Sequence, residues 1–306
     1  MANVTVQIRN LTKKIGNKTI VDRLTFDVPK GEVFGLLGPN GAGKTTTIRM
    51  MVGLISITEG EVIIEGYNVA KQFERAIARV GAIVENPELY KFLSGYENLI
   101  HFARMIPGIP KQRIDEVVSL VKLENRIHDK VKTYSLGMRQ RLGVAQAILH
   151  RPSVLILDEP TNGLDPEGIR EMRDYLRHLA RTEGTSVIVS SHLLSEMELM
   201  CDRVAVLQNG KLIDVRPIRD MARESETTFV FEVDLPEKAQ TVLSAAAPET
   251  NPSVGDGGVA VVTSRDRIPA LVRLLVEAQI GIYSVRAVTK SLEEHFLEVT
   301  RGGRIG

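Results

Sequence analysis

A glycine-rich segment near the start of the chain constrains its fold more than any other feature. Residues 38–45 read Gly-Pro-Asn-Gly-Ala-Gly-Lys-Thr and match the phosphate-binding pattern G-x-x-x-x-G-K-[ST]. A β-rich run at 32–37 precedes the segment, and a run at 43–53 with the pattern of a helix follows it. The pattern binds phosphate in this order of strand, loop and helix, so the sequence predicts an α/β fold with a nucleotide site.

The residue types in this loop each suit phosphate chemistry. Glycines let backbone N–H groups turn inward around a phosphate, and the helix N-terminus adds positive potential. Lys44 can reach the β- and γ-phosphate oxygens, and Thr45 offers a hydroxyl to Mg²⁺. A glycine turn with an incidental lysine is the alternative, which the flanking strand and helix disfavour. We expect the nucleotide to contact Gly38, Pro39, Asn40, Gly41, Ala42, Gly43, Lys44, Thr45 and Thr46.

Two adjacent acidic residues end a second apolar run. Residues 153–157 read Ser-Val-Leu-Ile-Leu, a pattern typical of a strand buried on both faces, and Asp158 and Glu159 follow directly. This arrangement holds one carboxylate near magnesium and places the other where it can polarise an attacking water. A solvated turn is the alternative, and the phosphate-binding pattern upstream makes it the weaker one.

Composition and charge limit the class of protein. The 306 residues are 43% hydrophobic and 25% charged, which is ordinary for a globular chain. The net charge of +1 provides no overall field to attract nucleic acid or an anionic membrane. Cys201 is the single cysteine, and the chain starts without a signal-peptide pattern, so we expect a cytoplasmic protein. Its apolar runs are too short for a membrane span, so a partner would have to supply one.

The pattern of elements predicts two domains. Residues 1–216 are expected to form an α/β domain that contains a helical block at about 86–151, and residues 217–306 a small accessory domain. The βα order of the second domain suggests a ferredoxin-like layer, with a loop at 251–258 and a last helix at 292–300. Packing or dimerisation is the plainer interpretation of this accessory domain.

Further motifs make the chain resemble the ATP-binding cassette (ABC) family across about residues 4–215. Residues 134–138, Tyr-Ser-Leu-Gly-Met, stand at the place of the family's LSGGQ signature, and residues 162–165, Asn-Gly-Leu-Asp, look like its D-loop. His192, just after a strand-like run, matches the family's switch histidine. The resemblance implies a P-loop NTPase ABC cassette with a RecA-like core, an antiparallel β subdomain and a helical subdomain, followed by a small α+β C-terminal domain.

The resemblance also implies roles for these residues. Glu159 and His192 would be the catalytic pair, with His192 on the γ-phosphate. Ser135 and the Gly137 amide would address the γ-phosphate held by a partner subunit. Taken alone, however, Ser135 is an ordinary helix N-cap and His192 an ordinary histidine.

The sequence departs from the family pattern at three positions. Ile15 replaces the aromatic residue that stacks on adenine, which puts the discrimination of ATP from GTP in doubt. Glu85 replaces the Q-loop glutamine; it can still face magnesium, which gives Thr45, Asp158 and Glu85 as expected metal ligands, but it adds negative charge beside phosphate. Leu136 replaces a signature glycine. These variants resemble ATP-binding subunits of two-component exporters linked to antibiotic and peptide resistance.

The expected function is therefore that of an ATP-binding and ATP-hydrolysing subunit, with ATP and Mg²⁺ as cofactors, that powers a separate permease for drugs, peptides or lipids. The expected partners are a second cassette, in a homodimer or pseudo-dimer, and an integral membrane permease that holds the subunit on the inner face of the membrane. No nucleic acid is expected. The alternatives are a soluble ABC ATPase acting on nucleic acid or ribosomes, and a nucleotide-sensing regulatory subunit. The transported substrate is not encoded in this chain.

Overall fold

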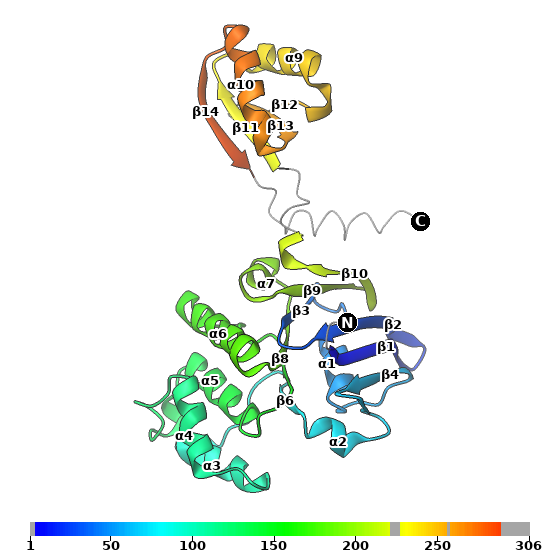
Figure 1. The fold of residues 1–306 in the computed structure, drawn as a ribbon, viewed down its shortest axis with the longest axis vertical. Helices are drawn as coiled ribbons and strands as arrows, with labels where there is room; N and C mark the ends of the chain where they lie inside the picture. Colours follow the sequence, from blue (N-terminus) through cyan, green and yellow to red (C-terminus); the bar gives the residue numbers. More distant parts are fainter. Residues whose placement is uncertain (1–3, 221–226, 256–257, 289–306) are drawn as a thin grey trace. The chain divides into compact units, whose positions relative to one another are not determined.

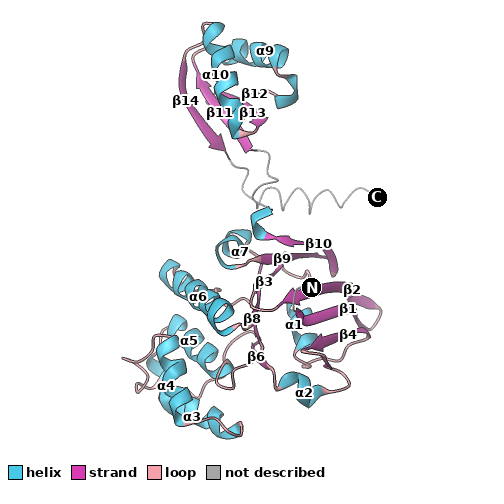
Figure 2. Cartoon of the chain, in the orientation of Figure 1, coloured by secondary structure: helices cyan, strands magenta, loops and turns pink. Residues whose placement is uncertain are grey.

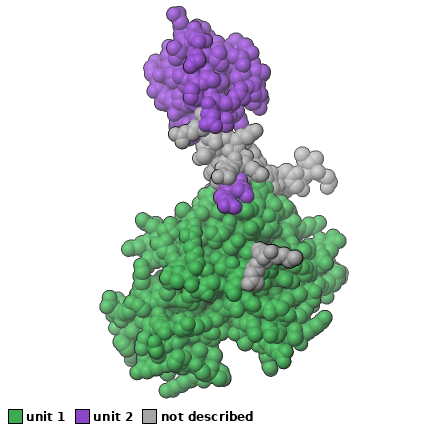
Figure 3. Space-filling model, in the orientation of Figure 1, with its two compact units in different colours: residues 1–218 green, residues 219–306 purple. Residues whose placement is uncertain are grey.

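The chain forms two compact units, residues 1–218 and 219–306, coloured separately in Figure 3. The computed structural model describes residues 4–220, 227–255 and 258–288. The helix expected at 292–300 lies outside the described residues. Among the described residues, no helix has the length and apolar character needed to cross a bilayer.

A six-stranded, mostly parallel sheet forms the centre of the first unit (Figure 2). Three interior strands, at 33–37, 154–157 and 186–191, are buried along their whole length, as expected for strands covered on both faces. The two strands of this sheet that come last in the sequence, at 203–208 and 211–217, are joined by the Asn209-Gly210 turn and pair antiparallel. In spatial order the strands are β10 (Lys211–Pro217), β9 (Arg203–Gln208), β3 (Val33–Leu37), β8 (Ser186–Ser191), β7 (Val154–Leu157) and β6 (Val80–Ile83).

An antiparallel sheet and the helix α1 (Lys44–Met51) pack beside the central sheet (Figure 1). The hydrophobic core joins all three, and it includes Ile8 from the antiparallel sheet, Leu36 from the central sheet and Ile48 from α1, each fully buried. The strands of this second sheet, in spatial order, are β2 (Lys18–Pro29), β1 (Val4–Ile15), β4 (Glu59–Ile64) and β5 (Tyr67–Asn68).

The helical block is formed mainly by three helices that lie on the opposite side of the central strands from the antiparallel sheet (Figure 1). They are α3 (Gly95–Met105), α4 (Lys111–Leu120) and α5 (Leu136–Ala147). Ser94 starts α3 with a capping box, in which its hydroxyl accepts from the Glu97 N–H at 3.2 Å while its own N–H donates to the Glu97 carboxylate at 2.7 Å.

Three further helices of the described residues connect strands. Helix α2 (Phe73–Ile77) leads from β5 of the antiparallel sheet to β6 of the central sheet. Helices α6 (Pro166–His178) and α7 (Leu194–Met200) connect β7 to β8 and β8 to β9 within the central sheet. Helix α6 is continued by a π-helical turn at Leu179–Glu183. The core, the antiparallel β subdomain and the helical block together confirm the predicted ABC cassette fold.

The second unit is a small α+β layer. Its sheet has the order β12 (Ser253–Gly255), β13 (Gly258–Thr263), β11 (Thr227–Val233) and β14 (Ile282–Val288), and all neighbours pair antiparallel. With α9 (Pro236–Ala246) and α10 (Ile268–Glu277) between strands, this is the ferredoxin-like order that the sequence suggested. The prediction of a continuous loop at 251–258 is wrong, because β12 pairs with β13 inside it.

Candidate functional site

The phosphate-binding loop connects β3 to α1 in a conformation that requires its glycines. Gly41 and Gly43 have φ values of 82° and 101°, in the left-handed region that other residues rarely adopt. A Cβ at Gly38 would come within 2.3 Å of the Leu207 carbonyl oxygen. The buried Lys44 Nζ donates to the Gly38 carbonyl at 2.7 Å and lies 3.3 Å from that of Pro39, so the lysine spans the loop.

Four predicted residues meet beside this loop. Lys44 Nζ lies 3.6 Å from Glu159 Oε1, and His192 Nδ1 lies 3.3 Å from Glu159 Oε2. The adjacent Asp158 is only 6% exposed. Burial lowers the pKa of Lys44, and the neighbouring Glu159 and Asp158 carboxylates partly offset this by favouring the charged form.

Sheet topology explains this meeting. The central strands β3, β8 and β7 are parallel neighbours, so their carboxyl ends lie at one edge of the sheet. Lys44 lies just beyond the end of β3, Asp158 and Glu159 directly follow β7, and His192 directly follows β8. Ligands of open α/β sheets bind outside this edge, so the structure brings the four residues together where phosphate chemistry is expected.

Two serines directly precede His192, and the sequence predicted no role for either of them. Ser190 Oγ donates to Asp158 Oδ1 at 2.6 Å and accepts from the Glu159 N–H at 2.8 Å. Ser191 Oγ donates to Glu196 Oε2 at 2.7 Å. Only their position in the sequence could have indicated a role, because these two small polar residues end an otherwise largely apolar strand directly before His192.

Ser135 and Gly137 lie in a second cluster. Ser135 is the N-cap of α5, where its Oγ accepts from the Met138 N–H at 3.2 Å. Both residues line a hollow of about 460 Å³ together with the D-loop residues Gly163, Leu164 and Asp165. None of the residues that line this hollow belongs to the phosphate-binding loop.

The departures from the family pattern occupy defined places. Leu136 packs on the D-loop, since a Cβ at Gly163 would come within 2.9 Å of its Cδ2. Ile15 is 60% exposed at the end of β1. The exposed Glu85 carboxylate forms an ion pair with Arg49 of α1, so this side chain is directed to α1. Thr45 and Thr46 are half-buried in the first turn of α1.

Comparisons with known proteins agree with this geometry. Residues 21–162 match the family model described as ABC transporter. The chain is 59% identical over 297 residues, 96% of its length and 95% of the relative's, to the uncharacterized ABC transporter ATP-binding protein YhcH of Bacillus subtilis (strain 168). The chain belongs to the ABC transporter ATP-binding family. It is therefore an ATP-binding and ATP-hydrolysing subunit that powers a membrane permease.

Two further comparisons extend this assignment. The chain is 39% identical over 302 residues to the bacitracin transport ATP-binding protein BcrA of Bacillus licheniformis, covering 98% of this chain and 99% of BcrA. A solved ATP-binding subunit of an ABC transporter is 29% identical and aligns with a TM-score of 0.64, covering 72% of this chain and 92% of that one.

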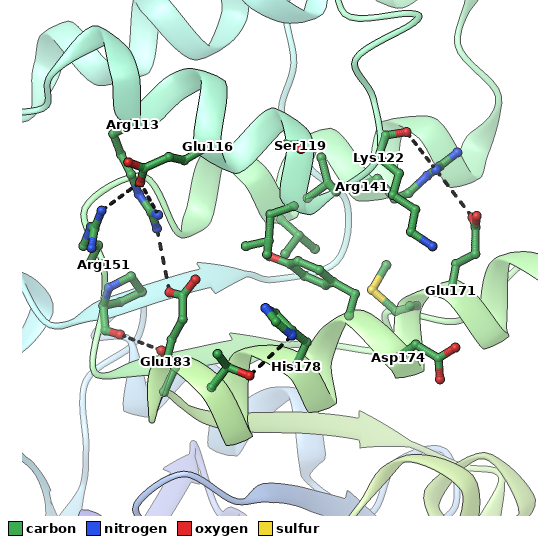
Figure 4. A pocket seen from close by; sticks show the side chains of 18 residues that line it. Arg113, Glu116, Ser119, Lys122, Arg141, Arg151, Glu171, Asp174, His178 and Glu183 are labelled. Carbon is green, nitrogen blue, oxygen red and sulfur yellow. Dashed lines mark hydrogen bonds and ion pairs between the residues drawn. The ribbon is translucent and has the colours of Figure 1, made fainter.

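A larger cavity of about 910 Å³ lies between the helical block and α6 of this ATP-binding subunit (Figure 4). Arg113 of α4 stands at its wall, donates to Glu116 at 3.2 Å and lies 4.0 Å from Glu183. None of the residues predicted to bind nucleotide lines it. This cavity is therefore separate from the residues predicted to bind nucleotide.

Proposed function

We propose that Lys44, Asp158, Glu159 and His192 form the hydrolytic half of an ATP site. The phosphate-binding loop, residues 38–46, would hold the phosphates, with Lys44 on the β- and γ-oxygens. Glu159 would polarise the attacking water and His192 would contact the γ-phosphate. The observation that carries this assignment is the meeting of Lys44, Glu159 and His192 within 3.6 Å contacts at the carboxyl edge of the sheet.

The donor set suits magnesium. Asp158 supplies a buried carboxylate and Thr45 a hydroxyl, and hard oxygen donors of this kind bind Mg²⁺ through few protein ligands beside the nucleotide phosphates. When bound, Mg²⁺ would neutralise charge on the phosphates. Glu85 would join this set only after its carboxylate leaves Arg49, so its metal role is proposed for the nucleotide-bound state.

Two copies of the cassette would complete each site. The hollow that contains Ser135 and Gly137 lies apart from the phosphate-binding loop of the same chain. In a second subunit these residues would face the γ-phosphate, so that two ATP molecules would be shared between two cassettes.

We propose residues 1–216 as the cassette and 217–306 as an accessory domain. The division into compact units supports this boundary. The helical block at about 86–151 would dock on an integral permease, which would hold the subunit on the cytoplasmic face of the membrane.

The substrate class that we propose for the complex is peptide antibiotics, moved outward. The similarity to BcrA over nearly the whole chain supports this choice. The test is to delete the gene and measure growth inhibition by bacitracin and by an unrelated antibiotic. Selective sensitivity that is restored by the wild-type gene, and not by a Lys44→Ala gene, is the expected result. Unchanged sensitivity to peptide antibiotics would contradict the proposed substrate.

A further inference from the structure

Ser190 occupies an unusual position for a serine. It lies at the carboxyl end of β8, two residues before His192, and is fully buried. Its hydroxyl donates to Asp158 Oδ1 at 2.6 Å and accepts the Glu159 N–H at 2.8 Å. One buried hydroxyl therefore contacts both members of the acidic pair.

These two hydrogen bonds act on different features of the acidic pair. The bond to Asp158 fixes the direction of a buried carboxylate oxygen. The bond from the Glu159 N–H holds a backbone with a φ of 47°, a left-handed conformation that is uncommon for a glutamate. That conformation sets the direction of the Glu159 side chain toward Lys44 and His192.

We infer that Ser190 is a positioning residue for ATP hydrolysis. Its hydroxyl holds Asp158 and Glu159 in the relative orientation in which one serves magnesium and the other the attacking water. The inference rests on the proposed roles of Asp158 and Glu159. Ser190 itself touches neither nucleotide nor water in this mechanism, and it acts only through the two acids.

A second connection keeps the segment in place when Ser190 is changed. Glu196 Oε2 accepts from Thr161 Oγ1, just beyond the acidic pair, and from Ser191 Oγ, each at 2.7 Å. The Leu193 N–H also donates to Ser191 Oγ at 3.0 Å. Because these bonds tie the ends of β7 and β8 together independently, we expect Ser190→Ala to remain folded.

The chain offers a matched control on the same strand. Ser186 starts β8, is also fully buried, and donates to Thr5 Oγ1 at 2.7 Å, at the end of the strand remote from the acidic pair. Ser186→Ala and Ser190→Ala therefore each remove one buried, hydrogen-bonded hydroxyl from β8. We expect both to lower the melting temperature by a few degrees, and only Ser190→Ala to affect hydrolysis.

The first experiment measures steady-state ATPase activity of the purified protein. We expect Ser190→Ala to lower kcat about 10- to 100-fold, the range found for residues that support metal ligands, with KM for ATP changed by less than about threefold. Ser190→Thr keeps the hydroxyl, and Ser190→Val has the shape of threonine without the hydroxyl. We therefore expect kcat of the Thr variant to exceed that of the Val variant about 10-fold. Equal turnover of the two, or Ser190→Ala turnover equal to that of Ser186→Ala, would overturn the inference.

The second experiment measures binding and requires no turnover. Calorimetric titration with ADP, with and without Mg²⁺, gives the gain in affinity due to magnesium. We expect Ser190→Ala to lose about 10-fold of this gain and Ser186→Ala to lose none. Equal gains in both variants would contradict the role assigned at Asp158. The turnover of Glu159→Gln distinguishes failure of the proposed function from failure of this inference. If Glu159→Gln turns over at the wild-type rate, the proposed catalytic roles are refuted. If Glu159→Gln loses turnover while Ser190→Ala keeps it, only the inference about Ser190 is refuted.

Discussion

The conformation of Glu159 connects backbone strain to chemistry. A non-glycine residue in the left-handed region costs about 1–3 kcal/mol and persists only where surrounding contacts hold it. Here the Glu159 N–H donates to Ser190, and its carbonyl accepts the Asn162 N–H at 3.1 Å. The carboxylate thereby reaches Lys44 and His192, as the general-base role proposed for Glu159 requires.

Replacing Glu159 with glutamine should separate binding from hydrolysis. The amide keeps the shape of the side chain but is a poor proton acceptor, so we expect turnover to fall about 10²- to 10⁴-fold. ATP binding should persist because the phosphate-binding loop is unchanged, and ATP-bound dimers should accumulate. Single-turnover hydrolysis and gel filtration with ATP measure these effects. Turnover at the wild-type rate would refute the assignment.

At the residue scale, a site residue could be predicted from the sequence where it belongs to a specific motif. The meeting of Lys44, Asp158 and Glu159 could be predicted, because the chemistry expected of a phosphate-binding loop needs those residue types at those positions. Ser190 could not, since buried serines serve many ends and only the three-dimensional pairing of β7 with β8 gives this one its partners. The pairing of Glu85 with Arg49 was equally hidden, because the two residues are 36 positions apart.

At the element scale, long and strongly patterned segments were predictable and short ones were not. Apolar runs such as 154–157 gave the buried strands directly. The helix α7 went unpredicted because seven residues barely complete two turns, too few for a periodic pattern. The composition of 251–258 is typical of a loop, so β12 was not predicted. This edge strand has three residues, and its pairing with β13 holds it in the sheet.

His150 connects the helical block to the central sheet and should make this junction sensitive to acid. Its Nε2 lies 3.1 Å from the Val80 carbonyl, while Nδ1 is buried and finds no hydrogen-bond partner among the described residues. Burial lowers the pKa of His150 below its usual value of 6.5. The unfolded chain therefore binds a proton more readily than the folded one, so stability is lost as the pH falls through about 6.5.

Changing His150 to glutamine should weaken this pH dependence. The glutamine side chain can still donate to Val80 but does not titrate. We expect the loss of unfolding free energy between pH 7.5 and pH 5.5 to be smaller in His150→Gln than in wild type, by up to about 1.4 kcal/mol for each unit of pKa difference. Urea unfolding at both pH values measures it, with the exposed His178→Gln as control. Equal losses in wild type and His150→Gln would contradict the mechanism.

The segment from Glu85 to Pro87 contacts two different parts of the cassette. Glu85 pairs with Arg49 on α1, the helix that follows the phosphate-binding loop. Pro87 packs on α5, where a Cβ at Gly143 would come within 2.4 Å of Pro87 Cβ. The segment thus joins the nucleotide-binding core to the helical block, which is the proposed docking region for the permease.

Removing the Glu85 side chain should impair this connection. An exposed ion pair contributes only about 0–1 kcal/mol, so Glu85→Ala should fold normally. We expect stimulation of ATPase activity by the permease to fall more than basal activity does, and Glu85→Gln, which retains an acceptor oxygen, to keep most basal activity. The control is Glu88→Ala, which removes the same charge from the same loop. Equal stimulation of wild type and Glu85→Ala in the reconstituted complex would favour a merely solvent-facing loop residue.

At the scale of the whole molecule, we propose that one chain carries two incomplete sets of ATP-binding groups. The phosphate-binding loop meets Glu159 and His192 at the edge of the central sheet. The signature residues line a hollow with the D-loop at the start of α5 and α6. If two chains share each site, one set from each chain would contact the same ATP molecule. This arrangement predicts that a variant with a defect in one set restores activity to a variant with a defect in the other set.

Mixing two inactive subunits tests this arrangement directly. Lys44→Ala removes the cation that is proposed to hold the β- and γ-phosphates, and Ser135→Arg places a bulky charge in the hollow that Ser135 lines. In a mixed dimer, one composite site receives both defects while the other receives neither, so one intact site remains. We expect each mutant alone to be nearly inactive and the mixture to recover part of the wild-type ATPase activity. The control mixes Lys44→Ala with Glu159→Gln, whose defects belong to the same set and therefore damage both sites. Recovery in neither mixture would mean that each chain hydrolyses ATP without the signature of its partner.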